Sequence, residues 1–179
     1  TDLRDMGYAS GSVEEGLINS CAAQMAQFYQ LPFYGTAGQS DSKTMDAQSG
    51  FEGAITNLMV GMAGGNFIHD AVGLLEFCMT ASYEKYVMDN EILGEVMRVL
   101  KGVEVSDETL AVDVTANVGP AGNFLLEEHT LQHMRNEHFV PKVADRSQRE
   151  DWEKNGCKDT MARCHEMALN ILENHKPVP

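Results

Sequence analysis

Four polar residues that follow an aromatic segment could bind a small polar or charged ligand. Gln39, Ser40, Asp41 and Lys43 come after a strand-like run at 31–36. Their amide, hydroxyl, carboxylate and ammonium groups could hold a substrate or a cofactor by hydrogen bonds and ion pairs. The alternative is an ordinary loop before a helix N-terminus, where Ser and Asp are common caps, and composition alone favours that alternative.

His69 and Asp70 form a second candidate group, directly after Phe67 and Ile68. An imidazole beside a carboxylate could act as a general acid/base pair or as a hydrogen-bonded ligand to a cofactor. The alternative is a buried histidine whose ring is hydrogen-bonded. Adjacent residues on a strand also point to opposite faces, which argues against a working pair.

His129 and His133 stand four residues apart on a predicted helix, with several carboxylates nearby. Two histidines at this spacing can share a zinc ion, as in a metal-dependent hydrolase. The His-Glu-x-x-His pattern is absent, however, and two ligands do not make a metal site. We therefore expect no metal and a solvated polar face, with the hydrolase kept as an alternative.

Aromatic side chains lie in or next to both strand-like runs. Phe33, Tyr34 and Phe67 could hold a quaternary ammonium group against their ring faces by cation–π attraction. The same rings could instead be ordinary core residues.

The elements that must position these groups alternate between helix and strand. Ser12 and Glu15 form a capping box that begins a helix, which ends before Pro32. A second helix has apolar residues at helical spacing over 47–62, and a second strand-like run covers 66–72. Apolar residues recur at helical spacing along the first helix: Val13, Leu17, Ile18, Cys21, Met25 and Phe28.

This alternation is typical of βα units around a parallel sheet. In an α/β barrel the chemistry lies in the loops after the strands, which here are 37–43 and 69–73. Two strands cannot close a barrel or form a stable open sheet alone. The chain is therefore either one end of a larger barrel or a small helical protein with a strand pair.

The sequence from Leu74 onward predicts helices almost throughout. No linker or repeat divides the chain, so we expect a single domain over 1–179. The predicted helices cover 82–101, a segment from the cap at Ser106 to Gly119, 124–136, a segment that begins at a capping box of Ser147 and Glu150, and a final helix with apolar residues over 161–172.

Charge and composition exclude several classes of protein. Thirteen basic and twenty-seven acidic side chains give a net charge of −14, which argues against a nucleic-acid partner. The most apolar stretch, 58–79, is interrupted by polar residues, so we expect no membrane span. The four cysteines do not form a disulfide framework, and we expect reduced thiols in a cytoplasmic protein.

The motifs, taken in order, resemble the trimethylamine methyltransferase family of corrinoid-dependent methyltransferases. The resemblance includes Ser40-Asp41-Ser42-Lys43 and extends over nearly the whole chain. It rests on residues 11–18, 26–29, 31–32, 40–43, 46–48, 52, 75–76, 88–90, 105–112, 123–125, 152, 158–159 and 174–175.

The resemblance implies a fold, a reaction and a partner. Members are longer (β/α)8 barrels of TIM type, and this chain looks like their C-terminal portion, with the last two strands and the helices that follow. Members move a methyl group from a methylated amine to the cobalt of a cognate corrinoid protein, which carries the cobalamin-type cofactor. The resemblance thus implies an enzyme, inactive as an isolated piece, and permits a homo-oligomer. A non-catalytic docking or structural fragment remains an alternative.

One residue departs from the family pattern. In the archaeal trimethylamine enzymes of methanogenesis, the residue before the Ser-Asp-x-Lys motif is pyrrolysine, and here it is Gln39. A glutamine amide lacks the electrophilic imine carbon that is thought to take up the amine. Members without pyrrolysine include glycine betaine methyltransferases, so a quaternary amine is the expected substrate, with trimethylamine as the alternative. A quaternary nitrogen has no lone pair to add to an imine, and its methyl group is already on a cationic leaving group.

Candidate roles follow from this resemblance. Gln39, His69 and Asp70 are expected to be catalytic. The expected substrate-binding residues are Phe33, Ser40, Asp41, Lys43 and Phe67.

Overall fold

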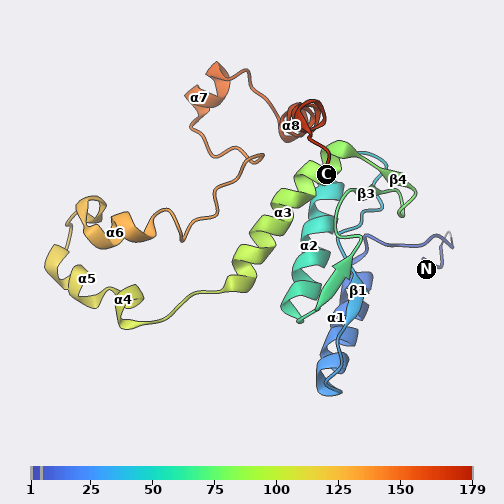
Figure 1. Cartoon of the computed structure of the whole chain (residues 1–179), viewed down its shortest axis with the longest axis horizontal. Helices are drawn as coiled ribbons and strands as arrows, with labels where there is room; N and C mark the ends of the chain where they lie inside the picture. The colour runs from blue at the N-terminus through green and yellow to red at the C-terminus, as the bar shows by residue number, and fades with distance from the viewer. Residues whose placement is uncertain (1, 5, 179) are drawn as a thin grey trace. The chain divides into compact units, whose positions relative to one another are not determined.

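The computed structural model describes residues 2–4 and 6–178. It divides into two compact units, of which the first comprises Thr1–Leu100 and Pro141–Pro179 and the second comprises Lys101–Val140. Figure 1 traces the chain through both. The candidate residues at 33–70 all lie in the first unit.

Two helices form one side of the first unit and lie side by side (Figure 1). The side chain of Ser12 caps α1 (Val13–Phe28) by accepting a hydrogen bond from the amide of Glu15. Asp46 and Ser49 form a capping box at the start of α2 (Ala47–Met62). Both helices thus begin where side-chain oxygens satisfy backbone donors that would otherwise be unpaired.

The predicted first helix is confirmed, but its large apolar residues are not the buried ones. The buried residues of α1 are the small residues Gly16 and Ala23. A Cβ atom at Gly16 would lie 3.3 Å from the sulfur atom of Met59 on α2. The larger apolar side chains are exposed instead: Val13, Leu17, Ile18, Met25 and Phe28.

The predicted parallel strand pair is confirmed. β1 (Tyr34–Thr36) and β2 (Phe67–His69) are parallel and are connected through α2. Tyr34 pairs with Phe67 and Thr36 with His69, so these four side chains share one face of the sheet. The structure is mixed α/β and mostly helical, as predicted, and it contains this βαβ unit. The rest of a barrel remains a prediction.

A hairpin interrupts the segment that was predicted to be helical after Leu74. β3 (Leu74–Leu75) and β4 (Thr80–Ala81) are antiparallel. Between them, Glu76, Phe77 and Cys78 all have positive φ angles, of 51°, 55° and 67°. Three consecutive left-handed residues cannot continue a right-handed helix. The next helix, α3 (Tyr83–Lys101), closely matches the predicted 82–101.

An apolar core cluster of the first unit joins α3 to the last helix and to the loop at Val143. It comprises Val87, Val143, Cys164 and Ala168, flanked by Met45, Met88 and Met167. Asp159 caps α8 (Thr160–Asn174), which is the predicted last helix.

The predicted capping box at Ser147 is wrong. The N-cap of α7 (Arg149–Lys154) is Gln148, which makes no side-chain capping bond. Ser147 instead donates its backbone and hydroxyl hydrogens to Asp145. Ser147 therefore stabilises the loop before α7 and does not cap the helix.

The second unit contains short helices where longer ones were predicted. The helix after Ser106 divides at Ala111, whose φ angle of 48° is left-handed. None of residues 101–140, all of which the structure describes, is buried. Its elements are α4 (Asp107–Leu110), α5 (Val112–Val118), the 3-10 turn η1 (Phe124–Leu126) and α6 (Glu128–His133).

The described residues include no helix with the length and apolar character that crossing a membrane requires. All four cysteines are free in the structure.

Candidate functional site

The two polar loops that follow β1 and β2 meet at the same edge of the sheet. Gly38 has a φ angle of 82°, and a Cβ atom there would overlap the carbonyl oxygen of Ala71. Only glycine combines this backbone conformation with such a close approach. The contact brings Gln39 of the first loop beside Asp70 of the second, with Nε2 and Oδ2 3.5 Å apart.

The side chain of Gln39 is buried, with only 3% of the residue exposed. Its Nε2 atom donates a hydrogen bond to Thr36 Oγ1 over 2.8 Å. Its Oε1 atom is also buried and has no hydrogen-bond partner among the described residues. A buried acceptor without a donor is costly, so this oxygen is suited to a donor from outside the described chain.

His69 and Asp70 do form a pair, although neighbours within a strand would diverge. β2 ends at His69, and Asp70 has a left-handed φ angle of 57° that turns its carboxylate back. His69 Nε2 and Asp70 Oδ2 are 3.3 Å apart, and their side chains are 34% and 47% exposed. The Nδ1 atom of His69 is buried without a partner among the described residues. The pair can therefore exchange a proton or hold a cation at an open edge.

A row of three rings extends along the sheet from this pair. Tyr34 stacks on Phe67 at 5.2 Å between ring centroids and on His69 at 4.6 Å. Tyr34 and Phe67 are nonetheless exposed, so a ligand can reach this row of rings. Tyr34 was considered as a ring that could hold a cation but was not among the expected substrate-binding residues, and its pairing with Phe67 in the parallel strands supports including it.

Phe33 does not belong to this row. It precedes Tyr34, so it points to the other face of the sheet, and its ring covers Gly35 where a Cβ atom would collide with it. Its backbone amide donates to the side chain of Asn66, which holds the start of β1 against the turn before β2. The rings of Phe33 and Phe67 therefore lie on different faces of the sheet, although the backbone amide of Phe67 donates to the Phe33 carbonyl oxygen over 3.1 Å.

The remaining predicted residues hold the first loop in place. Ser40 and the amide of Asp41 both donate to Glu52 Oε2, over 2.7 and 2.9 Å. The carboxylate of Asp41 accepts hydrogen bonds from Ser10 and Gly11. Their polar groups are therefore engaged within the chain.

Lys43 is likewise engaged by its own surroundings. Its Nζ atom donates to the carbonyl oxygen of Asp41 over 2.9 Å and lies 4.2 Å from the ring centre of Phe77. The left-handed turn at 76–78 carries that ring. The ammonium group thus joins the first loop to the hairpin.

A buried ion pair lies below the two loops and was missed by the sequence reasoning. Lys85 and Asp89, one turn apart on α3, have no exposed side-chain surface. Lys85 Nζ lies 2.5 and 2.7 Å from the two carboxylate oxygens, and Asp89 also accepts the amide hydrogen of Gly73. Burial raises the pKa of Asp89, while the ammonium group and the amide act in the opposite direction. Opposite charges four positions apart were the available signal.

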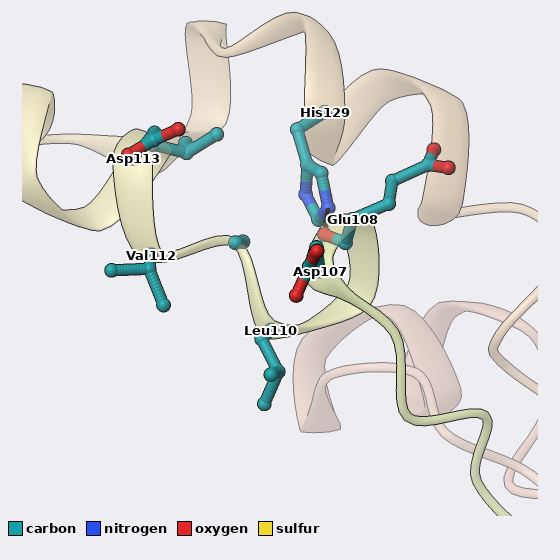
Figure 2. Close-up of a pocket in the computed structure, with 8 residues that line it drawn as sticks. Asp107, Glu108, Leu110, Val112, Asp113 and His129 are labelled. Carbon is teal, nitrogen blue, oxygen red and sulfur yellow. Dashed lines mark hydrogen bonds between the residues drawn. The ribbon is translucent and has the colours of Figure 1, made fainter.

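The two histidines of the second unit lie near a pocket formed where α4 meets α5. Asp107, Glu108 and His129 line it, with the imidazole directed toward the turn at Glu108 (Figure 2). His129 Nε2 donates to the Glu108 carbonyl oxygen over 2.9 Å. His133 Nε2 is 3.3 Å from Glu108 Oε1, so both rings are engaged by this one residue.

Across the residues that the structure describes, no three His, Cys, Asp or Glu side chains gather as a metal site would require. The hydrolase alternative therefore lacks a ligand set within the described chain.

Comparison with known proteins places these features in a family. A model described as trimethylamine methyltransferase (MTTB) matches residues 1–179. The chain is 44% identical over 178 residues to trimethylamine methyltransferase MttB of Desulfitobacterium hafniense (strain DSM 10664 / DCB-2), covering 99% of this chain and 36% of that protein. It is 37% identical over 177 residues to glycine betaine methyltransferase of Desulfitobacterium hafniense (strain Y51), covering 99% and 37%.

A third relative is archaeal. The chain is 40% identical over 178 residues to trimethylamine methyltransferase MttB of Methanosarcina thermophila, covering 99% of this chain and 36% of that protein. The chain therefore spans little more than a third of the length of these relatives.

Proposed function

Because the chain belongs to the trimethylamine methyltransferase family, we propose that it forms the C-terminal part of an enzyme that demethylates a methylated amine. The proposed substrate is a quaternary amine such as glycine betaine. The proposed methyl acceptor is the cobalt of a separate corrinoid protein. A cytoplasmic location belongs to the same proposal.

One observation carries this proposal: a carboxylate lies at the carboxyl edge of the parallel strands, and a row of aromatic rings extends from that edge along one face of the sheet. Asp70 supplies negative charge at the edge, and Tyr34 and Phe67 are exposed rings of the row that begins at its partner His69. Cations are attracted to ring faces and to carboxylates, and a methylated ammonium group also benefits from apolar contact. Most of the remaining polar groups nearby are already hydrogen-bonded within the chain.

The chemistry of Gln39 supports a quaternary rather than a tertiary amine. Its amide offers no electrophilic carbon of imine type, so it does not suit a mechanism that captures an amine lone pair. A quaternary nitrogen has no such lone pair, and its methyl group is activated by the positive charge. The protein then needs only to hold the cation, align one methyl group and exclude water.

We assign these tasks to particular residues of the site. Tyr34, Phe67 and Asp70 hold the ammonium group, and Gln39 and His69 fix the direction in which it lies. The corrinoid, when its protein docks, supplies the nucleophilic metal that receives the methyl group. The C–N electron pair stays on nitrogen, so the product is a neutral tertiary amine that is attracted less strongly and leaves.

The other predicted residues act in this proposal by shaping the loops. Ser40 and Asp41 fix the first loop through Glu52 and the segment at 10–11. Lys43 joins that loop to the hairpin through Phe77. We expect their substitution to change the position of Gln39.

A methyl-transfer assay with the full-length enzyme tests the proposal. Reduced cobalamin, or the cognate corrinoid protein, is mixed with the enzyme and with glycine betaine or trimethylamine, and cobalt methylation is followed by absorbance. Transfer from glycine betaine alone supports the proposal. Transfer from trimethylamine alone retains the methyltransferase and refutes the quaternary substrate. No transfer from a panel of methylated amines refutes the proposed function.

A further inference from the structure

We propose that Asp89 and Lys85 are positioning residues, whose buried ion pair holds the 70–73 loop so that Asp70 faces Gln39. Asp89 Oδ2 accepts the amide hydrogen of Gly73 over 2.8 Å. Gly73 is only three residues after Asp70, at the end of the same loop. This inference rests on the proposed function for its kinetic test only.

The ion pair lies at the junction of all the elements that shape the site. A Cβ atom at Gly53 of α2 would lie 3.1 Å from Lys85 Nζ, 3.3 Å from the Gly38 carbonyl oxygen and 3.4 Å from Asp89 Oδ1. The pair is therefore enclosed by α2, α3 and the backbone of the first loop. A change in its volume or charge is transmitted to both loops because closely packed groups cannot move independently.

The 70–73 loop is fixed at two points. Asn57 on α2 donates its side-chain amide to the Ala71 carbonyl oxygen over 3.1 Å. Gly73 donates to Asp89 and accepts from the amide of Ser82 over 3.1 Å. Between these anchors and β2, Asp70 keeps the left-handed φ angle that turns its carboxylate toward His69 and Gln39. Such a conformation persists only where the surroundings enforce it.

Stability alone does not account for an ion pair at this place. Two apolar side chains of similar volume often replace a buried ion pair without loss of stability, whereas removal of one partner is strongly destabilising. Apolar replacements cannot accept the amide hydrogen of Gly73, however. The distinctive contribution of Asp89 is therefore this hydrogen bond, and Lys85 allows the carboxylate to remain charged while buried.

The first test measures the loop directly in the full-length enzyme. Hydrogen exchange is compared between the wild type, the single variant Asp89→Asn and the paired variant Lys85→Met/Asp89→Leu. The paired variant leaves no unpaired buried charge, so it is expected to fold even if the single variant does not. We expect the amides of 71–75 to exchange at least about tenfold faster in the variants, with the rest of α3 unchanged. Glu166→Gln, which removes an exposed ion pair with Lys158, is the control and is expected to change nothing at 71–75. Unchanged exchange at 71–75 in the paired variant overturns the inference.

The second test separates positioning from general destabilisation. In an otherwise wild-type enzyme, the paired substitution is expected to lower kcat by up to about 100-fold, with a smaller change in KM, because the substrate still binds but is poorly aligned. In an Asp70→Asn background the same paired substitution is expected to lower kcat by less than about threefold, because the residue that the ion pair positions is already altered. An equal fold-decrease of kcat in the wild-type and Asp70→Asn backgrounds overturns the inference. If no amine is demethylated, the proposed function fails, and the exchange result alone decides the inference.

Discussion

The amide nitrogen of Gln39 lies 3.5 Å from a carboxylate oxygen of Asp70, although 31 positions separate the two residues. They meet because each follows a strand of a parallel pair, and parallel strands end at the same edge of a sheet. Replacing Gln39 tests whether this meeting point binds substrate.

Gln39→Ala in the full-length enzyme is expected to reduce kcat/KM about tenfold or more while changing the melting temperature by only a few degrees. The side chain makes one short hydrogen bond, to Thr36, and leaves its oxygen without a partner among the described residues, so its net contribution to folding is about 1 kcal/mol. Activity and thermal unfolding are measured on the same preparation. Gln132→Ala is the control, because Gln132 lies in the second unit and binds Glu128 one turn away on α6. A large loss of stability with normal turnover would mean that Gln39 is structural.

Tyr34→Leu is expected to raise KM for a quaternary amine by about 2- to 30-fold, the range that corresponds to a cation–π contact of about 0.5–2 kcal/mol. Tyr34→Phe retains a ring face and is expected to change KM less. Binding of an uncharged analogue, in which carbon replaces the ammonium nitrogen, is measured by calorimetry for both variants. If the uncharged analogue loses as much affinity as the cation, the ring contributes apolar contact rather than cation binding.

The elements around this site differ in how far their sequence reveals them. The strands at 34–36 and 67–69 were predictable because aromatic and β-branched residues stand between clear helix ends. The hairpin at 74–81 was not, because its left-handed turn at Glu76, Phe77 and Cys78 contains no glycine. The turn is held by tertiary contacts, including a hydrogen bond from the Glu76 amide to the Ser42 carbonyl oxygen.

Burial was predictable only where apolar character decides it. Lys85 and Asp89 are charged, so a pattern of apolar residues does not identify them as core residues, yet their mutual neutralisation permits full burial. The large apolar residues of α1 satisfied the helical pattern, yet Gly16 and Ala23 make the contact with α2 because they allow a closer approach. A periodic pattern identifies a helix without showing which of its faces packs.

The contact between Glu84 and His165 predicts loss of stability in acid. His165 Nδ1 lies 2.9 Å from Glu84 Oε1 and joins α8 to α3, and this hydrogen bond, with that from Ser82, lowers the pKa of Glu84 from 4.5 to about 2. Because the pKa of Glu84 is lower in the folded state, its carboxylate stabilises the fold at pH values above 4.5, the pKa in the unfolded state. This stabilisation is lost as the pH falls from about 4.5 to 2. We expect a contribution of about 1 kcal/mol or less, since the histidine is exposed.

Denaturant unfolding of the wild type and of Glu84→Gln, measured from pH 6 to pH 2, checks this contribution. The difference in stability between the two proteins is expected to shrink as the pH falls. A difference that is constant with pH would show that the carboxylate charge contributes nothing.

The four free thiols are expected to react at different rates with an alkylating reagent. Cys21 and Cys157 are exposed, whereas Cys164 is buried in the core beside Val87 and Ala168. Burial raises the pKa of Cys164 to about 11, so almost none of it is in the reactive thiolate form at neutral pH. Iodoacetamide followed by peptide mapping is expected to label Cys21 and Cys157 in the native protein and Cys164 only after unfolding. Early labelling of Cys164 would contradict the packing of α8 on α3.

Two glycines of the same βαβ unit are expected to respond to alanine in opposite directions. Gly38→Ala introduces a Cβ atom that overlaps the Ala71 carbonyl oxygen at a left-handed φ angle, so it forces the two loops apart. We expect it to destabilise the protein by about 2 kcal/mol or more and to abolish activity by separating Gln39 from Asp70. Gly50 lies inside α2, and a Cβ atom there would have no neighbour within 4 Å, so Gly50→Ala is expected to stabilise by about 0.5–1 kcal/mol with activity unchanged. Denaturant unfolding and kcat/KM are measured for both. Normal activity of Gly38→Ala would show that the close approach of the two loops is not needed for the reaction.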